Sequence, residues 1–175
     1  RETIRTHIER ERSLYPKGIK VLSLFFIDHV ENYRVYNTDG HELGEYAQMF
    51  EEEYIRVMQE MQPTFADEKY LRYLSGIHVS QTHQGYFSRD KKGKFVNSKV
   101  ERGSTDSADV DAYTLIMKDK ETLLSLDSAV KGSQVRFIFS HSALKEGWDN
   151  PNVFQICTLK NSDNETKKRQ EVGRG

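Results

Sequence analysis

The sequence is poor in cysteine and has no long apolar run, and both shortages exclude classes of protein. It contains one cysteine, Cys157, in 175 residues, so it cannot be a small secreted domain held together by internal disulfides. No apolar stretch approaches the about 20 residues of a membrane-spanning helix, and Arg1 to Arg5 lack the apolar core of a signal peptide. We therefore expect a cytoplasmic protein with no membrane partner, in which Cys157 is a buried apolar side chain rather than a reactive thiol.

An excess of either charge is also missing. Lys and Arg together number 26 and Asp and Glu number 27, which excludes a uniformly basic nucleic-acid-binding protein. The charges are unevenly placed, however, because residues 39–69 hold nine acids and two bases, whereas residues 89–102 hold six bases and two acids. A polyanionic partner such as DNA would therefore meet local basic patches.

The order of apolar patterns predicts one domain of the α/β class. Helices are expected at residues 1–14, 45–61 and 110–126, and strands at residues 19–27, 135–139 and 153–159. The strands are almost continuously apolar, as in a parallel sheet covered on both faces, so we expect an open parallel sheet flanked by helices. The loops at the carboxyl ends of such strands form the working edge, and here they begin at Asp28, Ser140 and Lys160.

Residues 77–109 interrupt this alternation and predict an inserted β-hairpin. Runs at 79–88 and 94–96 flank a turn over 90–93, whose glycine suits a positive φ. Four bases crowd around the turn: Arg89, Lys91, Lys92 and Lys94. They can form a basic finger that binds DNA phosphates without regard to sequence. The alternative is a tip that the lysines merely keep soluble.

The segment from Phe139 to Val153, FSHSALKEGWDNPNV, carries the first chemical motif. It leaves one expected strand, turns through Gly147 and presents the carboxylate of Asp149 at the working edge. Three side chains that can hydrogen-bond phosphate oxygens begin it: Ser140, His141 and Ser142. Taken alone, the segment could equally be a structural link between two strands.

The second motif is RQEVGRG at residues 169–175. Arg174 lies between glycines and can reach out of its own domain without steric obstruction. A guanidinium is suited to neutralising the charge that builds up on a transferring γ-phosphoryl group. A lone Gly-Arg-Gly is a weak signal, but its position some two dozen residues after Gly147 strengthens it.

Together the two motifs resemble motifs V and VI of superfamily 2 helicases. The wording of residues 137–157 is similar in particular to the restriction (Res) subunit of type III restriction–modification enzymes, and residues 85–88, 116–121 and 21–33 add to the likeness, the last as motif IV. The resemblance spans nearly the whole chain. It implies that residues 1–175 form a second, C-terminal RecA-like lobe of the P-loop NTPase type, truncated within motif VI.

The resemblance also implies roles at an ATP site. Gly147, Asp149 and Gly173 would lie near the nucleotide, while Gln170 and Arg174 would face the β- and γ-phosphates, with Arg174 as an arginine finger. ATP and Mg²⁺ would be bound mainly by a first lobe, whose phosphate loop and acidic box these residues lack. We therefore expect no cofactor on this chain alone, and neither ATP hydrolysis nor DNA cleavage by it.

On the DNA side, the resemblance implies a motor lobe of an ATP-dependent translocase that belongs to a site-specific endonuclease. Ser140 to Ser142, together with Asp28, His29 and Tyr33, would contact DNA phosphates. The implied partners are double-stranded DNA, the first RecA-like lobe and nuclease domain of the same protein, and a modification methyltransferase subunit. We expect no metal site, because the histidines lack ligand partners at suitable spacing.

Two other functions stay open. One is the second lobe of another superfamily 2 helicase that acts in DNA repair or on RNA, although the wording EGWDNP favours the type III version. The other is a non-catalytic RecA-like module that binds nucleic acid without ATP turnover. The presence of both Asp149 and Arg174 argues against such loss of activity.

Overall fold

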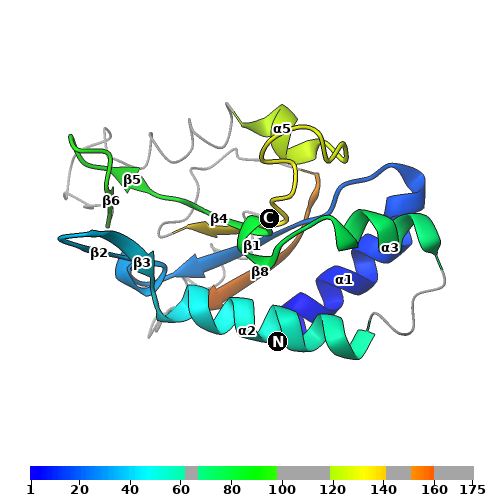
Figure 1. The fold of residues 1–175 in the computed structure, drawn as a ribbon, viewed down its shortest axis with the longest axis horizontal. Helices are drawn as coiled ribbons and strands as arrows, with labels where there is room; N and C mark the ends of the chain where they lie inside the picture. Colours follow the sequence, from blue (N-terminus) through cyan, green and yellow to red (C-terminus); the bar gives the residue numbers. More distant parts are fainter. Residues whose placement is uncertain (62–66, 98–118, 141–150, 160–175) are drawn as a thin grey trace, which may run out of the picture.

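Four parallel strands form the centre of the computed structural model, which describes residues 1–61, 67–97, 119–140 and 151–159. Their spatial order is β4-β7-β1-β8, and Figure 1 shows them running side by side through the middle of the molecule. They are β1 (Leu22–Ile27), β4 (His83–Tyr86), β7 (Phe137–Ser140) and β8 (Val153–Leu159). All three pairings in the sheet are parallel. The predicted α/β class is confirmed, and the arrangement is consistent with a RecA-like fold.

Helices cover both faces of this sheet (Figure 1). One face carries α1 (Glu2–Leu14), α2 (Glu45–Met61) and α3 (Glu68–Ser75), and the other carries α5 (Lys120–Leu124). The expected helices at 1–14 and 45–61 are confirmed. Helix α5 is the part of the expected 110–126 helix that lies within the described residues. Helix α3 was not expected; Asp67 begins it, because its carboxylate accepts hydrogen bonds from the backbone N–H groups of Lys69 and Tyr70.

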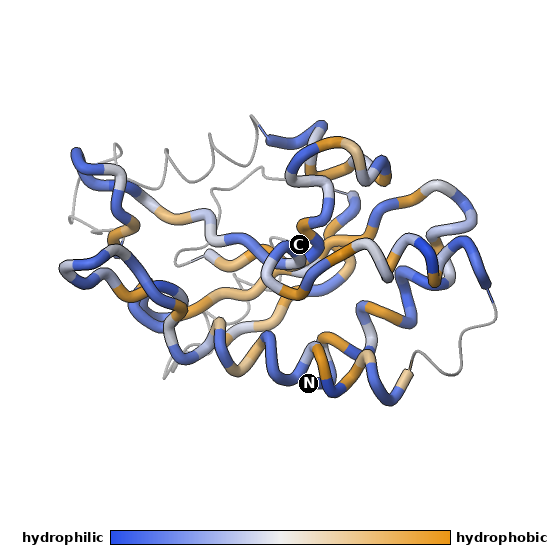
Figure 2. The backbone as a smooth tube through the Cα atoms, viewed as in Figure 1, coloured by the Kyte–Doolittle hydropathy of each residue, from blue (hydrophilic) through white to orange (hydrophobic). Residues whose placement is uncertain are grey.

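Alternation along β1 explains why its sequence, apart from the buried Ser23, is apolar. Phe25 and Ile27 face the core beneath α1 and α2, whereas Leu22, Leu24 and Phe26 face the second core beside α5. Each side chain of this size contributes about 1.5–3 kcal/mol when fully buried. Figure 2 accordingly shows apolar chain concentrated in the central strands. Because both faces are covered, no position of the strand is left for a polar surface residue.

The expected hairpin at 77–109 is present but shorter than predicted. Within the part of this segment that the structure describes, residues 77–97, the antiparallel pair consists of β5 (Ser88–Arg89) and β6 (Phe95–Val96), and Gly93 in their turn has the expected positive φ of 77°. The run assigned to the first arm instead contains β4, which pairs with β7 in the parallel sheet. The sequence did not predict β4 as a strand of the parallel sheet, because a buried parallel strand is normally an apolar run and β4 contains polar residues.

A second hairpin lies in a segment for which we predicted no strand. It consists of β2 (Arg34–Asn37) and β3 (Gly40–Leu43). Three single 3₁₀ turns complete the described elements: Tyr15–Lys17, Val30–Asn32 and Val79–Gln81. Figure 1 shows both hairpins at one end of the molecule, beyond the arrowheads of β1 and β8. The hairpins therefore extend the carboxyl edge of the sheet.

A buried ion pair occupies the opposite, amino-terminal side. Arg136, which directly precedes β7, is fully buried and donates hydrogen bonds to Glu11 Oε2 (2.6 Å) and to the Tyr54 hydroxyl. The Tyr70 hydroxyl donates to the same Glu11 oxygen (2.8 Å). Burial acts to raise the pKa of Glu11, but the charge of Arg136, the nearby His7 ring (Nε2 to Oε1 3.8 Å) and the hydrogen bond from Tyr70 outweigh it and lower that pKa to about 2. Because it lies far from the working edge, we interpret this pair as structural.

Candidate nucleic-acid interface

The four parallel strands end level with one another. Ser140 at the end of β7 is in register with Phe26 of β1 and with Tyr86 of β4, and Leu159 of β8 is in register with Ile27. The segments that follow all four strands therefore leave from one edge. This confirms the prediction that the loops starting at Asp28 and after Ser140 share the carboxyl edge of the sheet.

All five predicted ATP-site residues and two of the DNA-site residues lie outside the described residues: His141, Ser142, Gly147, Asp149, Gln170, Gly173 and Arg174. Ser140 is described, and its side chain is only 1% exposed. Ser140 therefore marks the point on the carboxyl edge at which the 141–150 segment begins. The roles of these residues therefore stay predictions.

The loop after β1 is shaped by its own side chains. Asp28 Oδ1 accepts hydrogen bonds from the backbone N–H of His29 (2.9 Å) and from Asn32 Nδ2 (2.6 Å). The next backbone N–H, that of Val30, donates to Asn97 Oδ1 (2.7 Å) and so ties the loop to the end of β6. Asp28 thus holds the loop in place, whereas His29 is exposed at its surface. Of these side chains, His29 is the one available to a ligand.

Tyr33 does not lie on the surface, contrary to its predicted role in DNA contact. It is 1% exposed, and its hydroxyl lies 3.0 Å from His83 Nδ1. The other ring nitrogen of His83 lies 3.0 Å from Glu51 Oε1. Burial raises the pKa of the Tyr33 phenol, and burial lowers the pKa of His83 against the opposing effect of Glu51. A neutral His83 therefore links Tyr33 to Glu51 inside the core, and we leave Tyr33 out of the DNA surface.

The lysines of the β5–β6 hairpin are exposed on a turn of defined shape. Asp90 Oδ1 accepts hydrogen bonds from the backbone N–H groups of Lys92 (2.8 Å) and Lys94 (2.9 Å). Oδ1 of Asp90 is thereby engaged by the turn, and among the described residues Asp90 forms no ion pair with a lysine. Lys91, Lys92 and Lys94 thus stand together on a fixed tip, as a basic finger requires.

A cleft separates the two hairpins, and we call it the hairpin cleft. It has a volume of about 430 Å³. Its lining residues come from the loop after β1 and from both hairpins: Val30, Glu31, Arg34, Val35, Tyr36, Phe95, Val96 and Asn97. The Tyr36 hydroxyl accepts a hydrogen bond from the Phe95 backbone N–H (2.9 Å), which joins β2 to β6.

Cations in and beside the hairpin cleft are held against aromatic rings. The Arg34 guanidinium carbon lies 4.9 Å from the centre of the Phe95 ring, and that of Arg89 lies 5.3 Å from the same ring. Lys94 Nζ lies 5.2 Å from the centre of the Tyr36 ring. Arg34 and Tyr36 were not predicted from the sequence. The signal that was available is Asp39-Gly40 between short alternating runs, which is typical of a hairpin turn.

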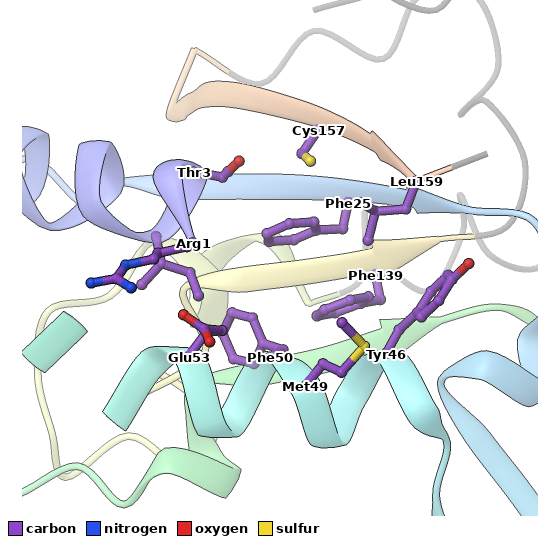
Figure 3. A pocket seen from close by; sticks show the side chains of 11 residues that line it. Arg1, Thr3, Phe25, Tyr46, Met49, Phe50, Glu53, Phe139, Cys157 and Leu159 are labelled. Carbon is purple, nitrogen blue, oxygen red and sulfur yellow. The ribbon is translucent and has the colours of Figure 1, made fainter. Parts of the chain in front are cut away.

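A second cavity, of about 280 Å³, lies against the face of the sheet that α2 covers (Figure 3). Phe25 and Phe139 form its floor, and Met49 and Phe50 of α2 line its side. Cys157 also lines it and is half-buried, less than the full burial predicted. Its lining is mostly apolar, and the polar side chains of Arg1, Thr3 and Glu53 also contribute to it.

Two kinds of feature are absent from the described part of the chain. None of its His, Cys, Asp and Glu side chains gather in threes at a spacing that could hold a metal ion. Within the same ranges, no helix combines the length and the hydropathy that a membrane crossing requires.

Comparisons with known proteins agree with the sequence resemblance, although no protein-family model matches the chain. It is 41% identical over 180 residues to the Res subunit of the type III restriction-modification enzyme EcoP15I of Escherichia coli, and equally so to that of EcoPI of Escherichia phage P1. It is 37% identical over 166 residues to the StyLTI Res subunit of Salmonella typhimurium. These matches cover 90–100% of the chain but only 16% of each relative. Over essentially its whole length, therefore, the chain is a relative of one segment of the Res subunits of type III restriction–modification enzymes.

Proposed function

We propose that residues 1–175 form the second RecA-like lobe of an ATP-dependent DNA motor within a type III restriction endonuclease. The observation that carries the proposal is the common carboxyl edge of the sheet. The loop after β1, the 141–150 segment and the segment after Leu159 all leave from it. In open α/β sheets, ligands bind in the crevice outside this edge.

In this proposal the two segments that follow β7 and β8 contribute to an ATP site. Gly147, Asp149 and Gly173 lie beside the nucleotide, and Gln170 and Arg174 face its phosphates. Arg174 supplies positive charge where negative charge develops on the transferring phosphoryl group. The level ends of β7 and β8 on either side of β1 support this pairing of segments.

The described residues do not fit a complete site for ATP and Mg²⁺. They contain no group of three carboxylates or other ligands for a metal ion. The sequence of residues 1–175 contains no Gly-x-x-x-x-Gly-Lys-Ser/Thr phosphate loop, and we propose that a first RecA-like lobe of the same protein binds the triphosphate and the metal. A nuclease domain and a modification methyltransferase subunit complete the proposed assembly, in keeping with the Res subunits that the chain resembles.

Double-stranded DNA is the proposed track. Its phosphates would meet His29 in the loop after β1, the 140–142 segment, and the lysine tip of the β5–β6 hairpin. The loop after β1 and the β5–β6 hairpin lie at or beyond the carboxyl edge of the sheet, which supports a single continuous surface. Such contacts are electrostatic and independent of base sequence, as a motor that moves along DNA requires.

ATP hydrolysis by two protein preparations tests the proposal. The intact protein that carries this chain should hydrolyse ATP when Mg²⁺ and duplex DNA are present, whereas residues 1–175 alone should not. Turnover by the isolated chain would contradict the single-lobe assignment. DNA binding by an intact protein that never hydrolyses ATP would instead establish the non-catalytic module.

A further inference from the structure

The hairpin cleft carries a cluster of positive charge that the described residues do not neutralise. Arg34, Arg89 and Lys94 lie in or beside it, and none of them has a carboxylate partner among the described residues. Arg34 Nε is buried and has no hydrogen-bond partner there. Like charges held this close repel one another, so an anion bound in the cleft would relieve that repulsion.

The aromatic rings of the cleft are occupied by these cations. Phe95 contacts both arginines, and Tyr36 contacts Lys94. A ring that already holds a guanidinium is not free to stack on a nucleic-acid base. Here the rings serve to fix the cations in place, which lowers the entropy lost when a ligand binds. The cleft is therefore built for phosphate groups rather than for bases.

The pleat of the β2–β3 hairpin keeps its acids away from this site. Arg34 and Tyr36 alternate with Val35 along β2, and Glu42 is in register with Val35, so Glu42 shares a face of the hairpin with Val35 and not with Arg34 and Tyr36. Val35 itself also contributes to the lining of the cleft. The Glu42 carboxylate accepts a hydrogen bond from Asn37 Nδ2 (2.7 Å) on that face. Glu31 is the one acid among the residues that line the cleft. Arg34 offsets the charge of Glu31 within the lining, and Arg89 and Lys94 beside the cleft, with one acid, Asp90, between them in the sequence, leave a positive balance.

We propose that the hairpin cleft binds the sugar–phosphate backbone of duplex DNA, with Arg34 as its central phosphate contact. The choice of DNA as the source of phosphate rests on the proposed motor function. The position of the cleft supports it, because both hairpins extend the edge at which the proposed DNA surface lies (Figure 1). Contact through phosphates alone would give binding that does not depend on base sequence.

The test is a titration of the intact protein with a fluorescently labelled duplex oligonucleotide, followed by anisotropy. Arg34→Met should weaken duplex binding about tenfold, as removal of one charge-assisted phosphate interaction does. It should also lower the slope of log affinity against log salt by about 0.9, the value for one phosphate of duplex DNA. Arg72→Met is the matched control, since Arg72 is an exposed arginine on α3, at the other end of the molecule.

Two further variants separate the contact from folding and from net charge. Phe95→Leu keeps every cation but removes the ring that holds Arg34, so it should weaken binding at unchanged charge. Arg34→Lys should fall between wild type and Arg34→Met, because an ammonium lacks the planar fork of the guanidinium. If Arg34→Met does not fold, as judged by circular dichroism, these two variants decide the question.

The outcomes distinguish the cleft from the motor. Duplex binding by Arg34→Met and Phe95→Leu that matches Arg72→Met would overturn the cleft assignment and leave the motor proposal standing. The cleft assignment would also be overturned if the variants lost affinity for a single strand of the same sequence but not for the duplex. A wild-type protein that binds no duplex at all would contradict both proposals.

Discussion

Among single residues, Glu11 shows how far burial can depart from a charge pattern. Helix α1 carries charged residues along its whole length, yet it buries His7 and Glu11 completely. Charged side chains are almost never buried without a partner, and the partner here, Arg136, is 125 positions further along the chain. No local pattern in the sequence could connect the two residues.

The Glu11–Arg136 pair predicts that the effect of Glu11→Gln on the free energy of unfolding changes sign when Arg136 is replaced. Arg136→Met should lower the free energy of unfolding by about 3–5 kcal/mol, because it leaves the Glu11 carboxylate buried without its counter-charge. Glu11→Gln should destabilise the wild-type chain but stabilise the Arg136→Met variant, since a neutral amide needs no counter-charge. Urea denaturation of the four proteins measures this. Equal effects of Glu11→Gln in both backgrounds would contradict the buried pair.

The same cluster predicts that stability falls in acid. The pKa of Glu11 in the folded chain is lowered from 4.5 to about 2, so its contribution is present above pH 4.5 and is lost as the pH falls toward 2. Burial also lowers the pKa of His7; its contribution is likewise lost as the pH falls below about 6.5, the ordinary value. The midpoint of thermal unfolding should therefore decrease steadily from neutral pH into acid. A midpoint that is constant over this range would contradict the assignment.

Gly85 predicts a packing defect of a different kind. A Cβ atom at this position in β4 would lie 2.6 Å from Tyr33 Cε1 and 2.4 Å from Phe87 Cε2. Gly85→Ala should therefore cost about 1–3 kcal/mol of stability through overpacking. Gly76→Ala is the control, because its Cβ would meet nothing closer than 3.8 Å. The control should leave stability unchanged or raise it by up to about 1 kcal/mol. Equal stabilities for the two variants would show that Tyr33 does not pack on β4 as described.

Among the elements, the apolar patterns predicted the bounds best where the spacing of apolar residues directly follows the buried face or faces. Strand β1 and helix α2 follow their predicted ranges because their apolar spacing reflects a buried strand and a one-sided helix directly. Strand β4 was missed as part of the parallel sheet because His83 and Gly85 break the apolar run. Both are explained by Tyr33, which hydrogen-bonds the first and packs on the second. That contact joins residues 50 positions apart and leaves no trace in either local segment.

We expect the lysines of the β5–β6 hairpin to bind DNA through their charge. Reversal of Lys91, Lys92 and Lys94 to Glu in the intact protein should flatten the salt dependence of duplex affinity. The slope should change by about 0.9 for each DNA phosphate that the lysines neutralise in the wild-type protein. Three exposed lysines on other surfaces, Lys17, Lys69 and Lys131, provide the matched control. Duplex titrations at several salt concentrations measure both sets. An unchanged slope in the tip variant would mean that the lysines only keep the hairpin soluble.

For the whole molecule, the sequence located the working edge but only part of what lies on it. The positions of Asp28 and Ser140 at strand ends were predictable, because strand ends can be read from apolar runs. The hairpin cleft was not predictable, because it depends on how two hairpins from separate segments pack at one end of the molecule. The buried Glu11–Arg136 ion pair lies at the amino-terminal side, and the exposed lysines of the β5–β6 hairpin lie at the carboxyl side, where we propose that DNA binds.

The most direct test of the motor assignment is the rate of DNA-stimulated ATP hydrolysis by the intact protein with Arg174→Ala. We predict a fall of about a thousandfold or more, the effect of losing an arginine finger, with duplex binding little changed. Lys167→Ala, which removes a nearby positive charge in the same segment, should retain most of the wild-type rate. Near-normal ATP turnover by Arg174→Ala would contradict the assignment of residues 1–175 as the lobe that completes an ATP site.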